Sequence, residues 1–115
     1  MRRVLVMEAH PQVLDALSDL VKEEPGLELV GVFGSAHEAI SEADRLRPDV
    51  VLLDMDEPNV RAQRLAHRFA ELLPGALIVR MYAATAPEAE CRSPEETHQD
   101  ILKTSTPEFL RSLTA

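Results

Sequence analysis

Hydrophobic positions in the sequence follow two patterns that alternate along the chain. Unbroken apolar runs occupy residues 4–7 and 50–53, and each is followed directly by an acidic residue. A run of this length is typical of a strand buried on both faces of a parallel sheet, whereas a half-solvated strand would alternate. The strand that contains the run 50–53 is expected over residues 49–54, with the carboxylate of Asp54 at its end.

Helical spacing separates the predicted strands. Apolar residues recur every three or four positions from Pro11 to about residue 23, again after the capping pair Ser35 and Glu38, and a third time over about residues 61–73. Further strands are expected at residues 27–33, 76–82 and 101–103, and Glu28 suggests that the first of these is an edge strand. A last short helix begins near Thr106. This alternation predicts an α/β fold with helices on both sides of a parallel sheet.

The predicted fourth helix is eroded. Residues 83–99 contain four glutamates, two prolines and almost no large apolar residue, so they predict an acidic loop or a rudimentary helical turn. Arg80 interrupts the strand before this segment. Because a buried arginine is costly unless it is paired or reaches solvent, we expect one face of the sheet near Arg80 to be poorly covered.

Length and charge narrow the class of protein. The 115 residues suit one domain over residues 1–115. A formal net charge of −8 repels phosphate backbones, so direct nucleic-acid binding is not expected. The single Cys91 excludes an internal disulfide, and the four histidines share no metal-ligand spacing. No apolar run is long enough to span a bilayer or form a signal peptide, and we expect a soluble cytoplasmic protein without membrane contact.

The candidate chemistry lies at the ends of the two buried strands. Ligands of open α/β sheets bind beyond the carboxyl ends of the strands, where Asp54 and Glu8 are expected. Each carboxylate could instead be an ordinary strand-end residue that caps a turn or is solvated. The chain contains no G-x-S-x-G, G-x-G-x-x-G or P-loop motif, so we do not expect an enzyme.

Three segments together resemble the receiver domain of response regulators, the CheY-like superfamily of two-component signalling. Residues 3–11, Arg-Val-Leu-Val-Met-Glu-Ala-His-Pro, resemble its first strand and acidic turn. Residues 47–54, Arg-Pro-Asp-Val-Val-Leu-Leu-Asp, followed by Pro58, resemble the strand that presents the phosphoacceptor aspartate. Lys103, before Thr106-Pro107-Glu108, resembles the lysine of this family. The resemblance implies a flavodoxin-like, three-layer, doubly wound sheet of five strands in the order 2-1-3-4-5.

The same resemblance implies a phosphorylation site. Asp54 would accept a phosphoryl group from a sensor histidine kinase or a phosphotransfer protein. Mg²⁺ would be held by Glu8, the Asp54 carboxylate and the backbone carbonyl of Asp56, and Lys103 would pair with the phosphoryl group.

Several positions depart from the pattern of the family. The second acidic residue after the first strand is replaced by Ala9, which weakens the implied magnesium site. The hydroxyl residue after the fourth strand falls at Tyr82, a candidate switch residue whose ring would crowd the site, unless the register slips by three residues to Thr85. The aromatic residue expected three positions before the lysine falls at Asp100.

We therefore predict an atypical receiver of a two-component phosphorelay that is phosphorylated on Asp54 and signals through protein–protein contacts. The alternative is a pseudo-receiver that acts as an interaction or dimerisation module without phosphotransfer. Ala9, Tyr82 and Asp100 favour the alternative, whereas Asp54 and Lys103 favour phosphorylation. A homodimer is compatible with either interpretation, and a small enzyme on the same fold is the least favoured.

Overall fold

A computed structural model describes residues 1–55, 60–82, 98–102 and 106–114; within these ranges, the side chains of residues 54–55, 60–62, 82 and 98–102 are not described. Strands and helices alternate from residue 2 to residue 82, as the sequence predicts. The elements are β1 (Arg2–Met7), α1 (Pro11–Glu23), β2 (Leu27–Phe33), α2 (Ala36–Leu46), β3 (Val50–Met55), α3 (Val60–Leu72), β4 (Leu77–Tyr82), β5 (His98–Leu102) and α4 (Thr106–Ser112).

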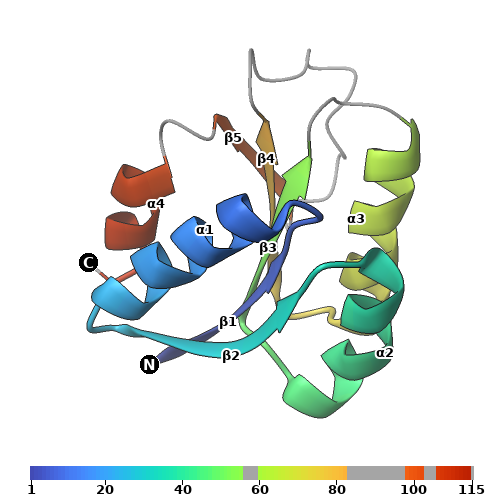
Figure 1. Cartoon of the computed structure of the whole chain (residues 1–115). Helices are drawn as coiled ribbons and strands as arrows, with labels where there is room; N and C mark the ends of the chain where they lie inside the picture. Colours follow the sequence, from blue (N-terminus) through green and yellow to red (C-terminus); the bar gives the residue numbers. More distant parts are fainter. Residues whose placement is uncertain (56–59, 83–97, 103–105, 115) are drawn as a thin grey trace.

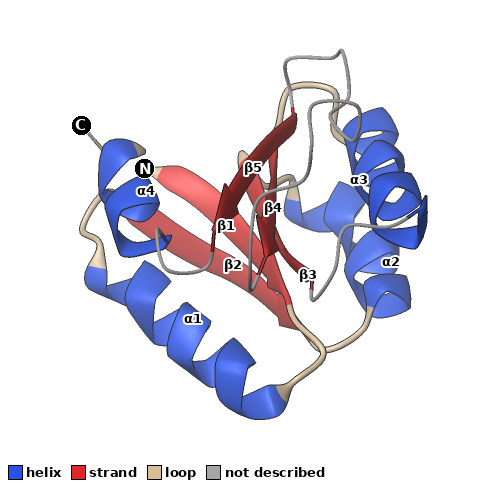
Figure 2. Cartoon of the chain, turned by 90° about the horizontal axis from the view of Figure 1, so that it is seen from above, coloured by secondary structure: helices blue, strands red, loops and turns tan. Residues whose placement is uncertain are grey.

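The five strands form one parallel sheet in the order β2-β1-β3-β4-β5, which confirms the predicted flavodoxin-like topology. Helices α1 and α4 cover one face of the sheet, and α2 and α3 cover the other (Figure 1, Figure 2). The prediction of an eroded fourth helix concerns residues 83–99, most of which lie outside the described part of the chain.

The two unbroken apolar runs form the centre of the sheet. In β1 and β3, Val4, Leu5 and Val6 and all four residues of the run 50–53 are 0% exposed, as expected for strands buried on both faces. Their side chains divide between two cores. Leu5, Val51 and Leu53 pack with α2 and α3, and Val4, Val6, Val50 and Leu52 pack with α1 and α4.

The helix boundaries follow from local chemistry. Pro11 occupies the first turn of α1, where its missing N–H leaves no bond unmade. The Ser35 hydroxyl accepts a hydrogen bond from the Glu38 backbone N–H at 3.2 Å and caps α2 as predicted. Arg47 ends α2 in the left-handed conformation, with φ 49°, directly before Pro48. Within the described residues, no helix is long and apolar enough to cross a membrane.

Strand β3 begins one residue later than predicted because Asp49 has another role. Its carboxylate accepts the Arg3 backbone N–H at 2.8 Å, its own N–H donates to the Arg3 carbonyl at 2.7 Å, and its carbonyl accepts the Leu77 N–H at 2.8 Å. Asp49 thus joins the amino ends of β1, β3 and β4.

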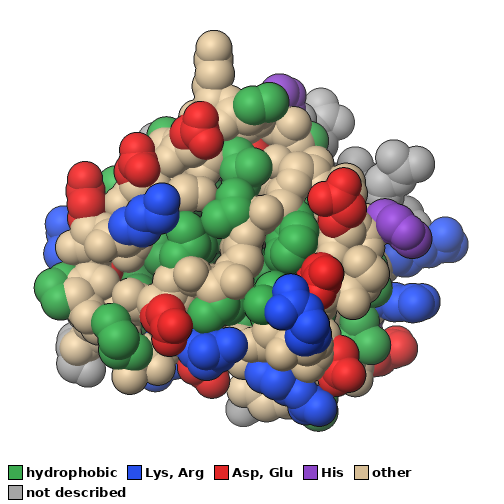
Figure 3. All heavy atoms as spheres, turned by 60° about the horizontal axis from the view of Figure 1, so that its bottom comes forward, with side chains coloured by type: hydrophobic (Ala, Val, Ile, Leu, Met, Phe, Trp, Pro, Cys, Tyr) green, Lys and Arg blue, Asp and Glu red, His purple; other side chains and the backbone are tan. Residues whose placement is uncertain are grey.

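The edge strand β2 has one partly solvated side. Val32 is 40% exposed, and Glu28 lies 3.7 Å from Arg3 of the neighbouring β1, as measured between their charged atoms. The lower side of the molecule carries acidic and basic side chains interspersed around apolar ones (Figure 3). Charged residues on an exposed strand oppose its pairing with other chains.

The prediction of poor cover near Arg80 is wrong. Arg80 is 2% exposed and is among the largest fully buried side chains of the described residues. Strand β4 is an inner strand, so Arg80 has a register partner on each side: Leu53 of β3 and Asp100 of β5. The sequence run around Arg80 did not show which residue β5 would bring beside it.

Candidate functional site

Glu8 and Asp54 occupy equivalent positions on the two central strands. The register between β1 and β3 pairs Met7 with Leu53, and Glu8 and Asp54 are the next residues of each chain segment. Strand β1 lies between β2 and β3, so the order of the sheet changes direction here. Doubly wound sheets bind ligands at such a point, beyond the carboxyl ends of the strands.

Strand β4 continues this row of positions across the sheet. Asp54 pairs with Met81, and Met81 is 1% exposed. The hydroxyl of Thr106, the first residue of α4, donates to the Met81 sulfur at 3.6 Å. Backbone position 54 therefore lies between β1 and β4, and α4 contacts its partner on β4.

The carboxylate of Glu8 is buried at the end of β1, with 2% of its surface exposed. Its Oε1 atom accepts a hydrogen bond from the His10 backbone N–H at 2.8 Å and lies 2.8 Å from the His10 ring Nδ1. The Glu8 N–H donates to the Phe33 carbonyl of β2 at 3.0 Å. Because burying an ionised carboxylate is costly without such partners, these contacts fix its position, and Glu8 is not a solvated strand-end residue.

His10 was missed as a member of this site. By sequence, the histidines are candidates only as metal ligands, and their spacing suits no metal site. The available signal is Pro11: a proline in the first turn makes the preceding residue the N-cap, and the two-residue turn from Glu8 brings the His10 N–H back to the carboxylate. The His10 ring itself is 60% exposed.

The remaining predicted site residues are only partly described. Tyr82 is the last residue of β4 and pairs with Met55, one position beyond the Asp54 pair. Lys103 follows the last residue of β5, but Lys103, Asp56 and Thr85 all lie outside the described residues. The roles assigned to Asp54, Lys103, Asp56 and Tyr82 therefore stay predictions.

The donor groups at this edge suit a hard cation. Carboxylate oxygens are the ligands that Mg²⁺ prefers, and the Oε2 atom of Glu8 is shielded from solvent. Among the residues that the structure describes, no three or more histidine, cysteine, aspartate or glutamate side chains form a group that could hold a metal. Glu8 and the position of Asp54 are thus the two candidate ligands that the described fold brings to one level.

Comparison with known proteins identifies the family. No family profile matches the sequence. An uncharacterized response regulatory protein of Yersinia pestis is 34% identical over 83 residues, which are 71% of this chain and 35% of that protein. A protein-glutamate methylesterase/protein-glutamine glutaminase of Syntrophus aciditrophicus is 33% identical over 90 residues, which are 78% of this chain and 26% of that protein.

Solved structures share the whole fold. The response regulator domain of Thermotoga maritima CheB superposes with a TM-score of 0.74 at 20% identity, covering 98% of this chain and 93% of that one. The response regulator RcsB, in a complex with DNA, gives a TM-score of 0.79 at 20% identity, covering 97% of this chain and 59% of that one.

The chain is a response-regulator receiver domain. This receiver spans 26% and 35% of the two curated relatives described above, so their other activities are not carried over with the fold. Its own sequence has Ala9 where the family pattern has a second acidic residue, and this receiver is therefore atypical at the edge where Glu8 lies.

Proposed function

We propose that this receiver accepts a phosphoryl group on Asp54 from a sensor histidine kinase or a phosphotransfer protein and passes the signal on through protein–protein contacts. The observation that carries the proposal is the buried carboxylate of Glu8, at the same level as Asp54 on the adjacent central strand. A buried acid beside a second acid is unfavourable unless the site holds a cation, and a cation is what phosphoryl transfer requires.

The proposed transfer uses few protein groups. A carboxylate oxygen of Asp54 attacks the phosphorus of a phosphohistidine. The phosphorus–nitrogen bond breaks, its electron pair returns to the imidazole nitrogen, and that nitrogen takes up a proton. Glu8, Asp54 and the Asp56 carbonyl would hold Mg²⁺, which neutralises charge on the phosphoryl oxygens, and Lys103 would pair with the charge transferred to Asp54.

His10 positions Glu8 in this proposal. Its backbone N–H and its ring both contact Oε1, and these contacts also orient the other, buried oxygen, Oε2. The Glu8 carboxylate is thereby held in one place before any ligand binds, which lowers the ordering cost of binding.

Titration with Mg²⁺ and beryllofluoride, followed by amide NMR, tests the proposal. Beryllofluoride mimics a phosphoryl group on a carboxylate. We expect the amide signals of Met7, Glu8, Asp54 and Met81 to shift further with Mg²⁺ and beryllofluoride together than with Mg²⁺ alone, because the phosphoryl mimic binds Asp54 only beside the cation. An absence of any shift in the wild-type protein would overturn the phosphoacceptor proposal.

A second candidate function is an interaction or dimerisation module that works without phosphorylation. It is favoured by Ala9, which removes one carboxylate, and by the two His10 contacts that already satisfy one oxygen of Glu8. Under this function the fold serves only as a binding surface, and beryllofluoride has no effect.

The receiver function and the charge of the chain also lead to proposals for its domain extent, location and partners. We propose one domain over residues 1–115, a cytoplasmic location, and no direct contact with nucleic acid or membrane, since the net charge is −8. The methylesterase and glutaminase activities belong to the named relative, and we propose no enzymatic activity for this chain beyond its own phosphoryl transfer.

Restoring the missing acid should strengthen the magnesium site. We expect Ala9→Asp to bind Mg²⁺ about tenfold more tightly, since a further carboxylate beside the cation adds an attraction of at least about 1.4 kcal/mol. Calorimetric titration measures the change. Ala16→Asp is the matched control, because Ala16 is exposed on α1 and the net charge changes equally. Equal affinities of the two variants would contradict the placement of the site.

A further inference from the structure

A groove lies between α2 and α3, on the face of the sheet opposite α1 and α4. His37 and Ile40 of α2 and Arg64, Leu65 and Arg68 of α3 line it, and its volume is about 400 Å³. A cavity of this size falls within the range of ligand-binding pockets. None of the residues of the proposed phosphorylation site lines it, and nothing in the proposed phosphoryl transfer uses it.

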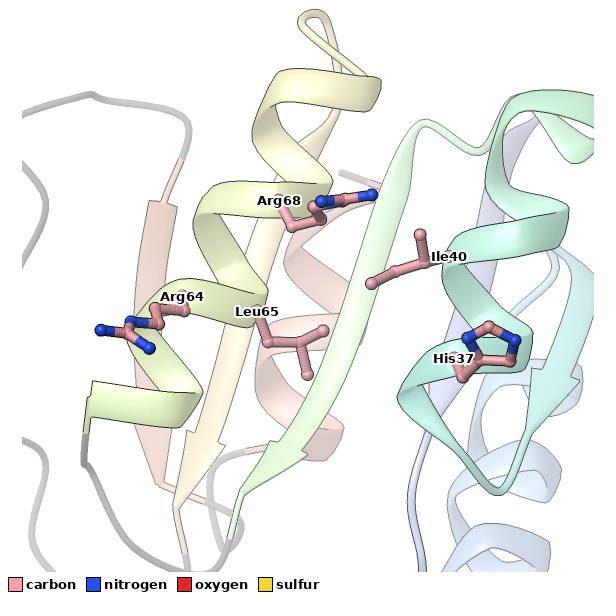
Figure 4. A pocket seen from close by; sticks show the side chains of 5 residues that line it. All are labelled: His37, Ile40, Arg64, Leu65 and Arg68. Carbon is pink, nitrogen blue, oxygen red and sulfur yellow. The ribbon is translucent and has the colours of Figure 1, made fainter.

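The groove has an aliphatic floor with one arginine, Arg68, above it (Figure 4). Ile40 and Leu65 are half-buried and point toward one another across the space between the helices (Figure 4). The exposed side chain of Arg68 extends from α3 toward α2 above them, while Arg64 points to the outer side of α3 (Figure 4). His37 is exposed at the start of α2.

Helix α3 differs in charge from the rest of this acidic protein. It carries three arginines and one glutamate, a formal charge of +2, whereas the net charge of the whole chain is −8. Helices α1 and α2 each carry −2, and α4 is neutral. Among the helices that the structure describes, α3 alone is positive.

The arginines of the groove are available to a partner. Neither Arg64 nor Arg68 forms an ion pair with any side chain in the described ranges. By contrast, Arg45 and Arg47, at the end of α2, are paired with Glu42 and Asp44. An arginine without an internal partner keeps its planar set of donors for a carboxylate of another molecule.

We propose that this groove binds an acidic segment of a partner protein. A large aliphatic side chain of that segment fits between Ile40 and Leu65, and an adjacent carboxylate pairs with Arg68. Nucleic acid supplies anions but no aliphatic side chain for the floor. An anionic membrane would meet the −2 charge of α2 beside the +2 charge of α3, whereas a narrow peptide can place its acidic residues over α3 alone. The proposal does not depend on phosphorylation of Asp54.

A synthetic peptide tests this proposal. The probe is a labelled peptide of alternating glutamate and leucine, with a glutamate–serine peptide and a lysine–leucine peptide as comparisons. We expect the glutamate–leucine peptide to bind most tightly and to shift the amide NMR signals of α2 and α3. Binding should weaken as salt is added, because the arginine contacts are exposed to solvent.

Charge reversal at matched positions separates a local contact from the effect of net charge. We expect Arg68→Glu to weaken binding of the glutamate–leucine peptide about tenfold or more. Arg111→Glu changes the net charge equally at an exposed position on α4 and should change the affinity less than about threefold. Both side chains are exposed, so both variants should fold.

Several outcomes would overturn the proposal. They are the absence of binding at millimolar peptide, equal effects of the two charge reversals, and peptide shifts confined to other elements. Tighter binding of phosphatidylserine vesicles or of a DNA duplex than of the peptide, lost in Arg68→Glu, would show that the groove takes a different anionic partner.

Discussion

The Asp54→Asn variant is expected to take up no phosphoryl group from acetyl phosphate in the presence of Mg²⁺, whereas the wild-type protein takes up one. Asparagine has almost the same shape as aspartate, so the fold should be kept. It lacks the anionic oxygen that attacks phosphorus, and it gives Mg²⁺ a weaker ligand. Intact-protein mass spectrometry measures the difference directly.

A matched control shows whether the loss of labelling is specific to Asp54. Asp19 is an exposed aspartate on α1, and Asp19→Asn should be labelled to the same extent as the wild type. Labelling that persists in Asp54→Asn would assign the acceptor to another carboxylate. If the wild-type protein is not labelled, the interaction module becomes the better account of this receiver.

The second large effect concerns the arginine buried in β4. Arg80 is 2% exposed, and Asp100 of β5 is its register partner. A buried guanidinium needs a nearby anion or several acceptors, since the cost of its desolvation is otherwise not recovered. We predict that Asp100 supplies this anion, so that Asp100→Ala lowers the free energy of unfolding by about 3–5 kcal/mol. Urea unfolding measures the change.

A double replacement distinguishes a charge pair from simple packing. Removing both charges, in Arg80→Met with Asp100→Leu, leaves no buried ion, so this double variant should be more stable than Asp100→Ala. Glu71→Ala removes an exposed acid on α3 and should change the stability by less than about 0.5 kcal/mol. A double variant as unstable as Asp100→Ala would contradict the pairing.

The hydrophobic pattern predicted most of the fold because the central strands allow only one structural interpretation. The unbroken runs at residues 4–7 and 50–53 suit only strands buried on both faces, and the prolines and glycines between elements mark the ends of helices. The edge position of β2 also followed from one polar residue, Glu28. These features depend on residues close together in the sequence, so the sequence alone is enough to predict them.

Features that depend on contacts between distant segments were harder to predict. The register partner of Arg80 on β5 lies some twenty residues later, and the sequence alone gave no register between β4 and β5. The groove between α2 and α3 has the same origin, since Ile40 and Leu65 meet only in the folded chain. Glu8 was predicted as a site residue, but its contact with His10 depends on the shape of one turn.

The bond between Thr106 and Met81 has a mechanical consequence. Thioether sulfur is a weak acceptor, and the 3.6 Å contact is correspondingly soft. This hydrogen bond by itself therefore resists a shift of α4 along the strand only weakly, and the packing of Leu110 provides most of the attachment. Because Met81 is the ladder partner of Asp54, a change in the backbone at position 54 needs to displace only one strand before it reaches the last helix.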